Sequence, residues 1–122
     1  MTDSLMPLWA GRYLKIKYLE GGLDRQGIDD WGMVRLVVSE QYNIALWAMP
    51  KSSGEHRRNT LLEHFPAVVD GIRTGDIVYL HRHKLFGLVV APNRILTALP
   101  KQGGRIYWYD NTSEKTVIRV RR

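Results

Sequence analysis

Apolar residues recur at helical spacing in the first part of the chain. Between Trp31 and Val38 they lie three and four residues apart, while Arg35 falls on the other side, so this stretch is predicted to form a helix with one apolar face. The helix should begin near residue 30, and either Asp29 or Asp30 can serve as its N-cap. The chain is therefore expected to be organised around the start of this helix.

A glycine-rich loop precedes this helix. Two shorter helices are also expected, one before the loop and one after the helix. Gly21, Gly22 and Gly27 allow backbone conformations in the loop that other residues adopt poorly. The capping-box pattern at 60–63 predicts a short helix that begins there and runs to about residue 64. Residues 5–18 are expected to hold a first helix, which includes Trp9, Tyr13 and Leu14.

From residue 74 onward the period of the apolar positions becomes that of strands. Turn residues at 82–84, 91–94 and 102–104 separate these strands. The predicted strands cover residues 76–81, 85–90, 95–99, 105–109 and 115–120. We expect an antiparallel meander of about five strands with the N-terminal helices packed on it, which is an α+β fold formed by a single domain over residues 1–122.

Composition and charge exclude several classes of protein. The 122 residues contain no cysteine, which excludes disulfides, thiolate zinc sites and cysteine nucleophiles. The net charge of +6 allows an acidic partner, but only Arg57–Arg58 and the tail at 119–122 gather basic residues, and no nucleic-acid-binding motif accompanies them. We do not expect nucleic acid to be the main partner.

The chain also lacks the features of a secreted or membrane-spanning protein. Its Met-Thr-Asp-Ser start is not a charged segment followed by an apolar one, and its apolar runs are too short to cross a bilayer. We therefore expect no signal peptide and no membrane span, and synthesis in the cytoplasm of a host cell.

The order of residues from Tyr18 to Val37 resembles a known family. The pattern Y-x-x-G-G-x-D-R-x-G-x-D, followed at one position's distance by W-G-x-V-R-L-V, is similar to that of the NlpC/P60 cysteine peptidases, particularly the members carried by phage tails. The position between the two parts holds the nucleophilic cysteine in that family. In this chain it holds Asp30.

The replacement of cysteine by Asp30 changes what this position can do. A thiol at a helix N-terminus becomes a reactive thiolate because the unpaired backbone N–H groups and the helix dipole lower its pKa. The same field is expected to depress the pKa of Asp30, which would make the carboxylate a weak base and a poor nucleophile toward an amide. Asp30 therefore suits a helix cap better than an acyl-transfer centre.

The predicted strands carry a second part of the same resemblance. Gly75–Asp76, Gly87 and Asn93–Arg94 match the family's strand pattern, which implies a papain-like NlpC/P60 fold. The position of the family's catalytic histidine holds Leu85, and that of its polar orienting residue holds Thr97. The resemblance thus implies a degenerate catalytic site at Asp30, Leu85 and Thr97.

Three neighbouring residues are further candidates for a binding role. The resemblance implies that Tyr18, whose counterpart often helps to form the oxyanion hole, lies near Asp30, and that Trp31 adjoins it. His83 lies two residues before Leu85 and would reach Asp30 only if the hairpin were shifted; the simpler interpretation is an exposed turn. No metal site and no cofactor is expected, because two histidines beside a turn are a weak signal for a metal.

Two functions remain as hypotheses at this point. The first is a non-catalytic domain that acts as a structural or interaction component of a phage or phage-like tail tip, with tail-tip or hub proteins as partners, possible contact with peptidoglycan fragments and a location in the virion tail. Its aromatic residues exceed what a small core requires, which is consistent with a contact surface. The alternative is a peptidoglycan hydrolase with altered chemistry, in which Asp30 is the nucleophile or general acid/base.

Overall fold

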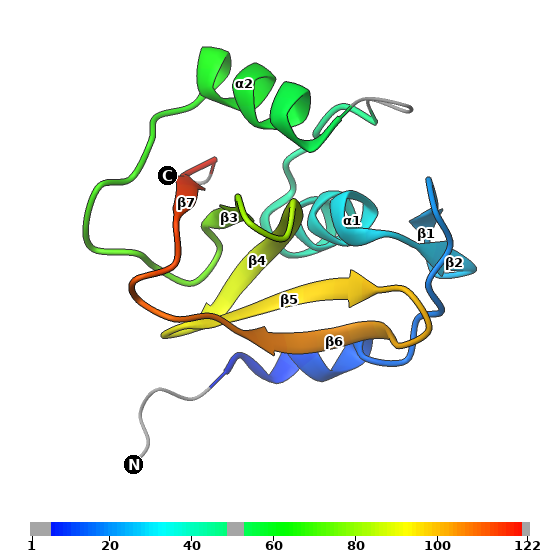
Figure 1. Ribbon diagram of the computed structural model, residues 1–122. Coiled ribbons are helices and arrows are strands. Elements are labelled where there is room, and N and C mark those ends of the chain that lie inside the picture. The colour runs from blue at the N-terminus through cyan, green and yellow to red at the C-terminus, as the bar shows by residue number, and fades with distance from the viewer. Residues whose placement is uncertain (1–5, 49–52, 121–122) are drawn as a thin grey trace.

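The computed structural model describes residues 6–48 and 53–120 and has the predicted α+β architecture, with helices on a five-stranded antiparallel sheet. Figure 1 shows α1 lying across one side of the sheet, with α2 apart from it near the β3–β4 end. The helices are η1 (Leu8–Tyr13, a 3-10 helix), α1 (Asp30–Tyr42) and α2 (Gly54–His64). The strands are β1 (Leu23–Asp24), β2 (Gly27–Ile28), β3 (Ile77–Leu80), β4 (Leu85–Ala91), β5 (Arg94–Leu99), β6 (Gly103–Trp108) and β7 (Lys115–Ile118).

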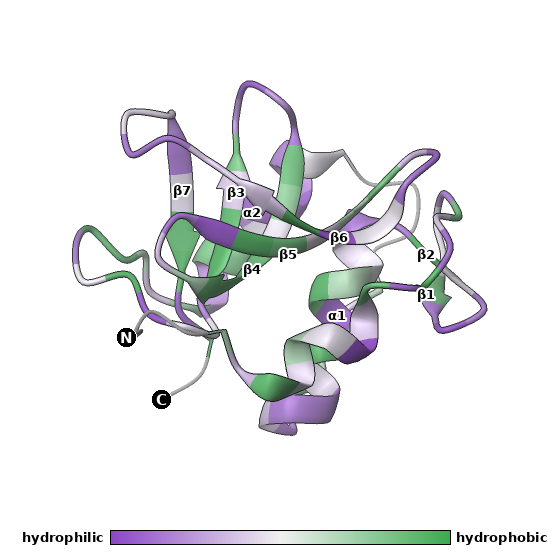
Figure 2. Cartoon of the chain, turned by 90° about the horizontal axis from the view of Figure 1, so that it is seen from below, coloured by the Kyte–Doolittle hydropathy of each residue, from purple (hydrophilic) through white to green (hydrophobic). Residues whose placement is uncertain are grey.

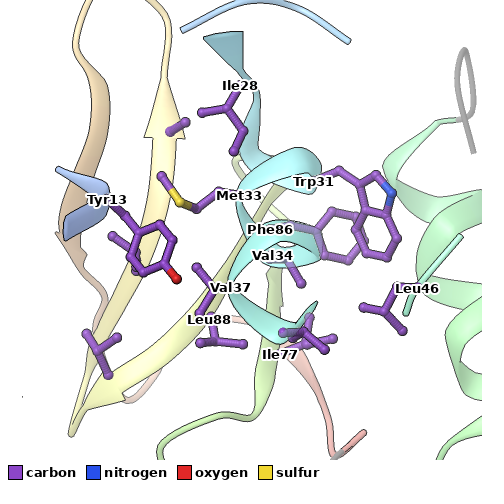
Figure 3. Packing of buried hydrophobic residues seen from close by; sticks show 14 of the residues in the cluster. Tyr13, Ile28, Trp31, Met33, Val34, Val37, Leu46, Ile77, Phe86 and Leu88 are labelled. Carbon is purple, nitrogen blue, oxygen red and sulfur yellow. The ribbon is translucent and has the colours of Figure 1, made fainter. Parts of the chain in front are cut away.

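The predicted apolar face of α1 forms the centre of the main core. Its residues Trp31, Met33, Val34, Val37 and Val38 are buried, and the helix packs against β4 and β5. Figure 3 shows the labelled side chains of this face, Trp31, Met33, Val34 and Val37, packed with Phe86 and Leu88 of β4 and with Tyr13. The start and the apolar face predicted for this helix are therefore confirmed.

The sheet has apolar residues on both faces. Alternate residues of the central strands join the main core beside α1, and the residues between them form a second cluster made of Val78, Leu80, Leu85, Val89, Ile95, Tyr109 and Val117. Figure 2 shows the central strands mainly in the hydrophobic colour and the connecting loops mainly in the hydrophilic colour. The side of the sheet on which a residue lies therefore decides whether it can face α1.

The order of the strands corrects the predicted meander. The sheet runs β6-β5-β4-β3-β7, so the last strand pairs with β3, with Ile77 opposite Ile118, and not with β6. The outer edge of β6 begins against the N-terminal segment, because the Gly104 N–H donates to the Ile16 carbonyl (2.9 Å). β7 instead takes the open edge of β3, where Ile118 is buried in the main core.

The two shorter helices also differ from their predicted extents. α2 begins at Gly54, because the Ser53 hydroxyl accepts a bond from the His56 N–H (3.0 Å) and acts as the N-cap. Thr60 lies inside the helix, where its hydroxyl donates to the His56 carbonyl, so the predicted start at residue 60 is wrong and the predicted end at residue 64 is right. The first helix is only the 3-10 turn Leu8–Tyr13, and Leu14 lies just beyond it.

The glycine-rich loop folds back as the small hairpin β1–β2 and delivers the chain to α1. The loop and the helix approach so closely that a Cβ atom on Gly32 would lie 2.0 Å from the Gly22 carbonyl oxygen. Ile28 anchors the hairpin, since its N–H donates to the Lys17 carbonyl (2.9 Å) and its carbonyl accepts from the Leu19 N–H (3.0 Å). A residue larger than glycine at position 32 would therefore push the loop away from the helix.

Candidate functional site

Asp29 is the residue that caps α1. One carboxylate oxygen accepts from the Gly32 N–H (2.7 Å) and the other accepts from the Gly21 N–H (2.9 Å). The side chain is buried, and it satisfies one donor of the helix start and one donor of the loop. Of the two aspartates that the sequence allows as a cap, it is thus Asp29, and not Asp30, that fills this role.

Asp30 reaches from the start of α1 to the beginning of β4. Its Oδ2 accepts a hydrogen bond from the Phe86 N–H (2.8 Å), and the buried Thr97 hydroxyl donates to the Phe86 carbonyl (2.6 Å). The residues of β4 that pair with β5 run from Leu88 to Ala91, so Phe86 lies before the paired segment. Asp30 and Thr97 therefore supply side-chain partners for backbone groups at the point where the two strands separate.

Burial, and not the field of the helix, dominates the acidity of Asp30. Loss of hydration raises its pKa to about 6, and the neighbouring charge of Asp29 also raises it; the hydrogen bonds from the Phe86 and Trp31 N–H groups and the charge of Arg57 lower it. The prediction of a depressed pKa is therefore wrong. The hydrogen bond from the Trp31 N–H at the helix start does lower the pKa, but its effect is smaller than the cost of removing a carboxylate from water.

Three aromatic rings, those of Trp31, Phe86 and Tyr79, pack next to one another beside the Asp30 carboxyl group. The ring centroids of Trp31 and Phe86 are 5.1 Å apart, and those of Phe86 and Tyr79 are 4.7 Å apart. Trp31 is completely buried, and its indole N–H donates to the Trp47 and Ala48 carbonyls (3.0 Å each). A ligand at this site would meet Trp31 only after a rearrangement, so its proposed binding role has no exposed surface to rest on.

The other predicted site residues lie in three different places: near Asp30, in an exposed turn and in the second cluster. Tyr18 lies near Asp30: burial raises the pKa of its hydroxyl, and the charges of Asp29 and Asp30 raise it further. His83 is exposed in the turn between β3 and β4, with its ring 6.0 Å from that of Tyr107. Leu85 belongs to the second cluster, on the side of the sheet that faces away from α1.

Sequence reasoning missed the residues that surround Asp30 most closely. Phe86 follows the predicted histidine position, and strand alternation alone would have placed one of these two neighbours toward the helix. Arg57 of α2 lies over the Trp31 ring (5.8 Å to its centroid) and attracts the Asp30 carboxylate. No sequence signal links α2 to this site, because the contact joins residues that are far apart in the chain.

The site holds two adjacent carboxyl groups, those of Asp29 and Asp30, and the chain has no thiol for nucleophilic catalysis. Among residues 6–48 and 53–120, no group of three histidine or acidic side chains could hold a metal ion. No helix in the described part of the chain is long and apolar enough to cross a membrane. What Asp30 can do is accept or release a proton near neutral pH and hold the start of β4.

Comparison with models of known protein families and with curated proteins found no match. Among solved structures, the chain is similar to the crystal structure of the NlpC/p60 domain of the peptidoglycan hydrolase SagA, with a TM-score of 0.68 and 15% sequence identity. The match covers 88% of this chain and 91% of the other. The chain therefore has an NlpC/P60-like α+β fold, and it has this fold without any cysteine.

Proposed function

We propose that this chain is a catalytically inactive NlpC/P60-like domain that serves as a structural or interaction component of a phage or phage-like tail tip. The inactive state is proposed because the Asp30 carboxylate is already engaged in a hydrogen bond within the fold. This carboxylate receives the Phe86 N–H at 2.8 Å and so supports the start of β4, in a chain that contains no cysteine. In this proposal the chain keeps the NlpC/P60-like fold, and Asp30, at the position of the nucleophile, stabilises the fold in place of catalysis.

The position of the histidines supports the same conclusion. A peptidase of this kind needs an imidazole within hydrogen-bond reach of its nucleophile. His83 lies in an exposed turn and His56 is exposed on α2. His81 bonds to the Thr116 hydroxyl (2.7 Å), and His64 bonds to the carbonyl of its own helix at Thr60 (3.0 Å). The residue that meets Asp30 from β4 is Phe86, which offers its backbone N–H and has no acidic or basic side chain to act as a catalytic base.

The tail-tip assignment is supported by the motif of the loop and helix. The pattern from Tyr18 to Val37 resembles most the tail-associated members of the NlpC/P60 peptidases. In a domain without chemistry, the partners would be tail-tip or hub proteins, with peptidoglycan fragments as a second class of ligand, and the location would be the virion tail. Several aromatic side chains remain available for such contacts, among them Trp108 (63% exposed) and Trp47 (41% exposed).

One observation favours an alternative, a hydrolase that uses Asp30. Its pKa of about 6 lies close to neutrality, where a carboxylic acid can donate and accept a proton. Glycosidic bonds, however, are cleaved by a pair of carboxyl groups about 5 to 9.5 Å apart. Asp29 does not provide the second one, because both of its oxygens already bind N–H groups of Gly32 and Gly21.

Release of soluble fragments from purified peptidoglycan tests both functions. The assay compares the wild-type chain with Asp30→Asn, which keeps an oxygen for the Phe86 N–H but cannot transfer a proton, and with an active cysteine peptidase of the same fold as a positive control. We expect the wild type to release no more than the Asn variant. Release by the wild type that disappears in the variant would refute the inactive domain and establish the hydrolase.

The location is tested separately from the chemistry. Tail tips isolated from particles of the phage or phage-like element that encodes the chain are analysed by mass spectrometry, with the major tail-tube protein as the internal reference. We expect the chain in the tail fraction at a constant ratio to that reference. Its absence from assembled particles would contradict the tail-tip role while leaving the result of the peptidoglycan assay unaffected.

A further inference from the structure

The outer edge of β6 carries backbone groups that have no backbone partner among the described residues. At the other end of the sheet, residues 66–68 cover β7: Val68 N–H donates to the Val117 carbonyl (2.8 Å) and Arg119 N–H donates to the Pro66 carbonyl (3.1 Å). Figure 1 shows β6 as the outermost strand at the opposite edge. Only the start of β6 is covered there, through the bond from Gly104 N–H to the Ile16 carbonyl (2.9 Å), in the part of the chain that the structure describes.

The open segment presents backbone groups at alternate residues. β6 pairs with β5 from Leu99 opposite Gly103 to Arg94 opposite Trp108. Because Gly104 directs its N–H away from β5, the N–H and carbonyl groups of Ile106 and Trp108 also point outward, while those of the residues between them point toward β5. Among the described residues, Ile106 and Trp108 have no backbone partner on the outer side, and the Ile106 carbonyl receives only a long contact from the exposed Arg105 side chain (Nε 3.5 Å away). Such an edge is a template for another strand.

The surface along this edge is basic. At the start of β6, a shallow hollow of about 360 Å³ is lined by Lys15, Lys17 and Lys101, and no carboxylate contributes to this lining. All three lysines are exposed. Arg105 is also exposed on β6 itself. A strand that docked on β6 and continued toward the hollow would therefore be attracted if it carried acidic residues.

An aromatic residue adds an apolar contact at the far end of the same edge. Trp108 is 63% exposed, and the Arg94 guanidinium stacks on its ring with Cζ 3.9 Å from the centroid. Arg94 holds one face of the ring in place from the neighbouring strand, which lowers the cost of ordering this side chain on binding.

We infer that the open edge of β6 binds an extended, acidic segment of a partner protein, which joins the sheet as an additional strand through Ile106 and Trp108 and reaches the lysine hollow with its acidic side chains. The inference concerns a surface away from Asp30 and does not depend on the proposed function. It combines three independent features of the same edge: open backbone groups, a lysine-lined hollow at its start and an exposed, stacked tryptophan at its far end.

Binding of two designed peptides to the full chain tests this inference. The first is an octapeptide of alternating threonine and glutamate, and the second has proline in place of each threonine, so that its charge is equal but it cannot form a strand. Titration is followed by amide resonances and by hydrogen exchange. We expect the first peptide to bind at least about tenfold more tightly than the second and to slow exchange at the Ile106 and Trp108 amides.

A matched pair of variants separates the edge from charge in general. Lys17→Glu/Lys101→Glu reverses two charges at the hollow, and Arg82→Glu/Lys84→Glu reverses two in the exposed β3–β4 turn. The pairs are matched in backbone too, since Lys101 (φ 68°) and Lys84 (φ 51°) both have left-handed conformations. We expect the first pair to weaken binding about tenfold and the second to change it by less than about twofold. Thermal unfolding confirms that both variants are folded.

Three results would overturn the inference. They are equal binding of the two peptides, equal loss of binding in the two variants, and unchanged exchange at the Ile106 and Trp108 amides on binding. A single-stranded oligonucleotide of equal charge is titrated in parallel. If it binds more tightly than the threonine–glutamate peptide and displaces it, the basic edge recognises nucleic acid and the protein-strand proposal is wrong.

Discussion

Replacement of Asp30 by asparagine is expected to change how stability depends on pH. Asparagine keeps an oxygen that accepts the Phe86 N–H but carries no charge at any pH. Burial raises the pKa of Asp30 from 3.8 to about 6, which corresponds to about 3 kcal/mol between its charged and neutral forms. The side chain is partly exposed, so we expect about 2 kcal/mol after solvent screening.

The sign follows from the direction of the shift. A raised pKa means that the folded chain binds this proton more tightly than the unfolded chain does. The stabilisation is fully present below about pH 4, and it is lost as the pH rises through about 6. The free energy of unfolding of Asp30→Asn minus that of the wild type should therefore increase by about 2 kcal/mol as the pH rises from about 4 to about 8.

Urea unfolding followed by tryptophan fluorescence measures this difference, because Trp31 is completely buried. The titration is repeated across the pH range for the wild type, for Asp30→Asn and for Asp24→Asn, which removes one exposed carboxylate in β1 and reports the general effect of charge. The reasoning would be refuted if the free energy of unfolding of Asp30→Asn minus that of the wild type stayed constant, or fell, as the pH rose from about 4 to about 8.

Three further substitutions test the contacts that hold the loop, helix and sheet. Asp29→Ala leaves the Gly32 and Gly21 N–H groups without an acceptor and should cost about 2 kcal/mol in urea unfolding, against little change for the exposed turn variant Asp110→Ala. Gly32→Ala places a Cβ atom 2.0 Å from the Gly22 carbonyl and should lower the unfolding midpoint by about 10 °C or more in calorimetry, whereas Gly11→Ala, with nothing within 4 Å, should be neutral. Asp76→Ala leaves Arg119 without the carboxylate that binds its Nε (2.9 Å) and Nη2 (2.8 Å), and should lower the free energy of unfolding by about 3 kcal/mol. A double-mutant cycle with Arg119→Met should show that the two effects are coupled. Additive effects would show that this ion pair does not contribute to stability.

The parts of the fold that sequence reasoning predicted are those set by local periodicity. The apolar face of α1 and its start follow from residues three and four apart, because each turn of a helix brings them to the same side. The central strands follow from short apolar runs between turn residues. In both cases the controlling interactions join residues that are close in the chain, so the chain alone carries the signal.

The errors lie where the local pattern allows more than one outcome. β7 pairs with β3 and not with β6, and in this position Ile118 is buried in the main core, which no local pattern in the chain indicates. α2 began six residues early, since Ser53 is as good a cap as Thr60 and nothing local distinguishes them. In each case the local sequence allows two outcomes, and the folded chain shows which strand edge or which N-cap is used.

For the candidate site, the sequence by itself determined the chemical limit and the tertiary structure decided the role. The absence of cysteine and the presence of Asp30 at the head of α1 exclude a thiolate nucleophile, whatever the fold. Only the packing of α1 on β4 brings the Asp30 carboxylate to the Phe86 N–H, turns Leu85 to the other face and raises the pKa of Asp30 to about 6. The physical reason is that hydration and hydrogen-bond partners belong to the folded environment, and a residue's position in the chain does not specify them.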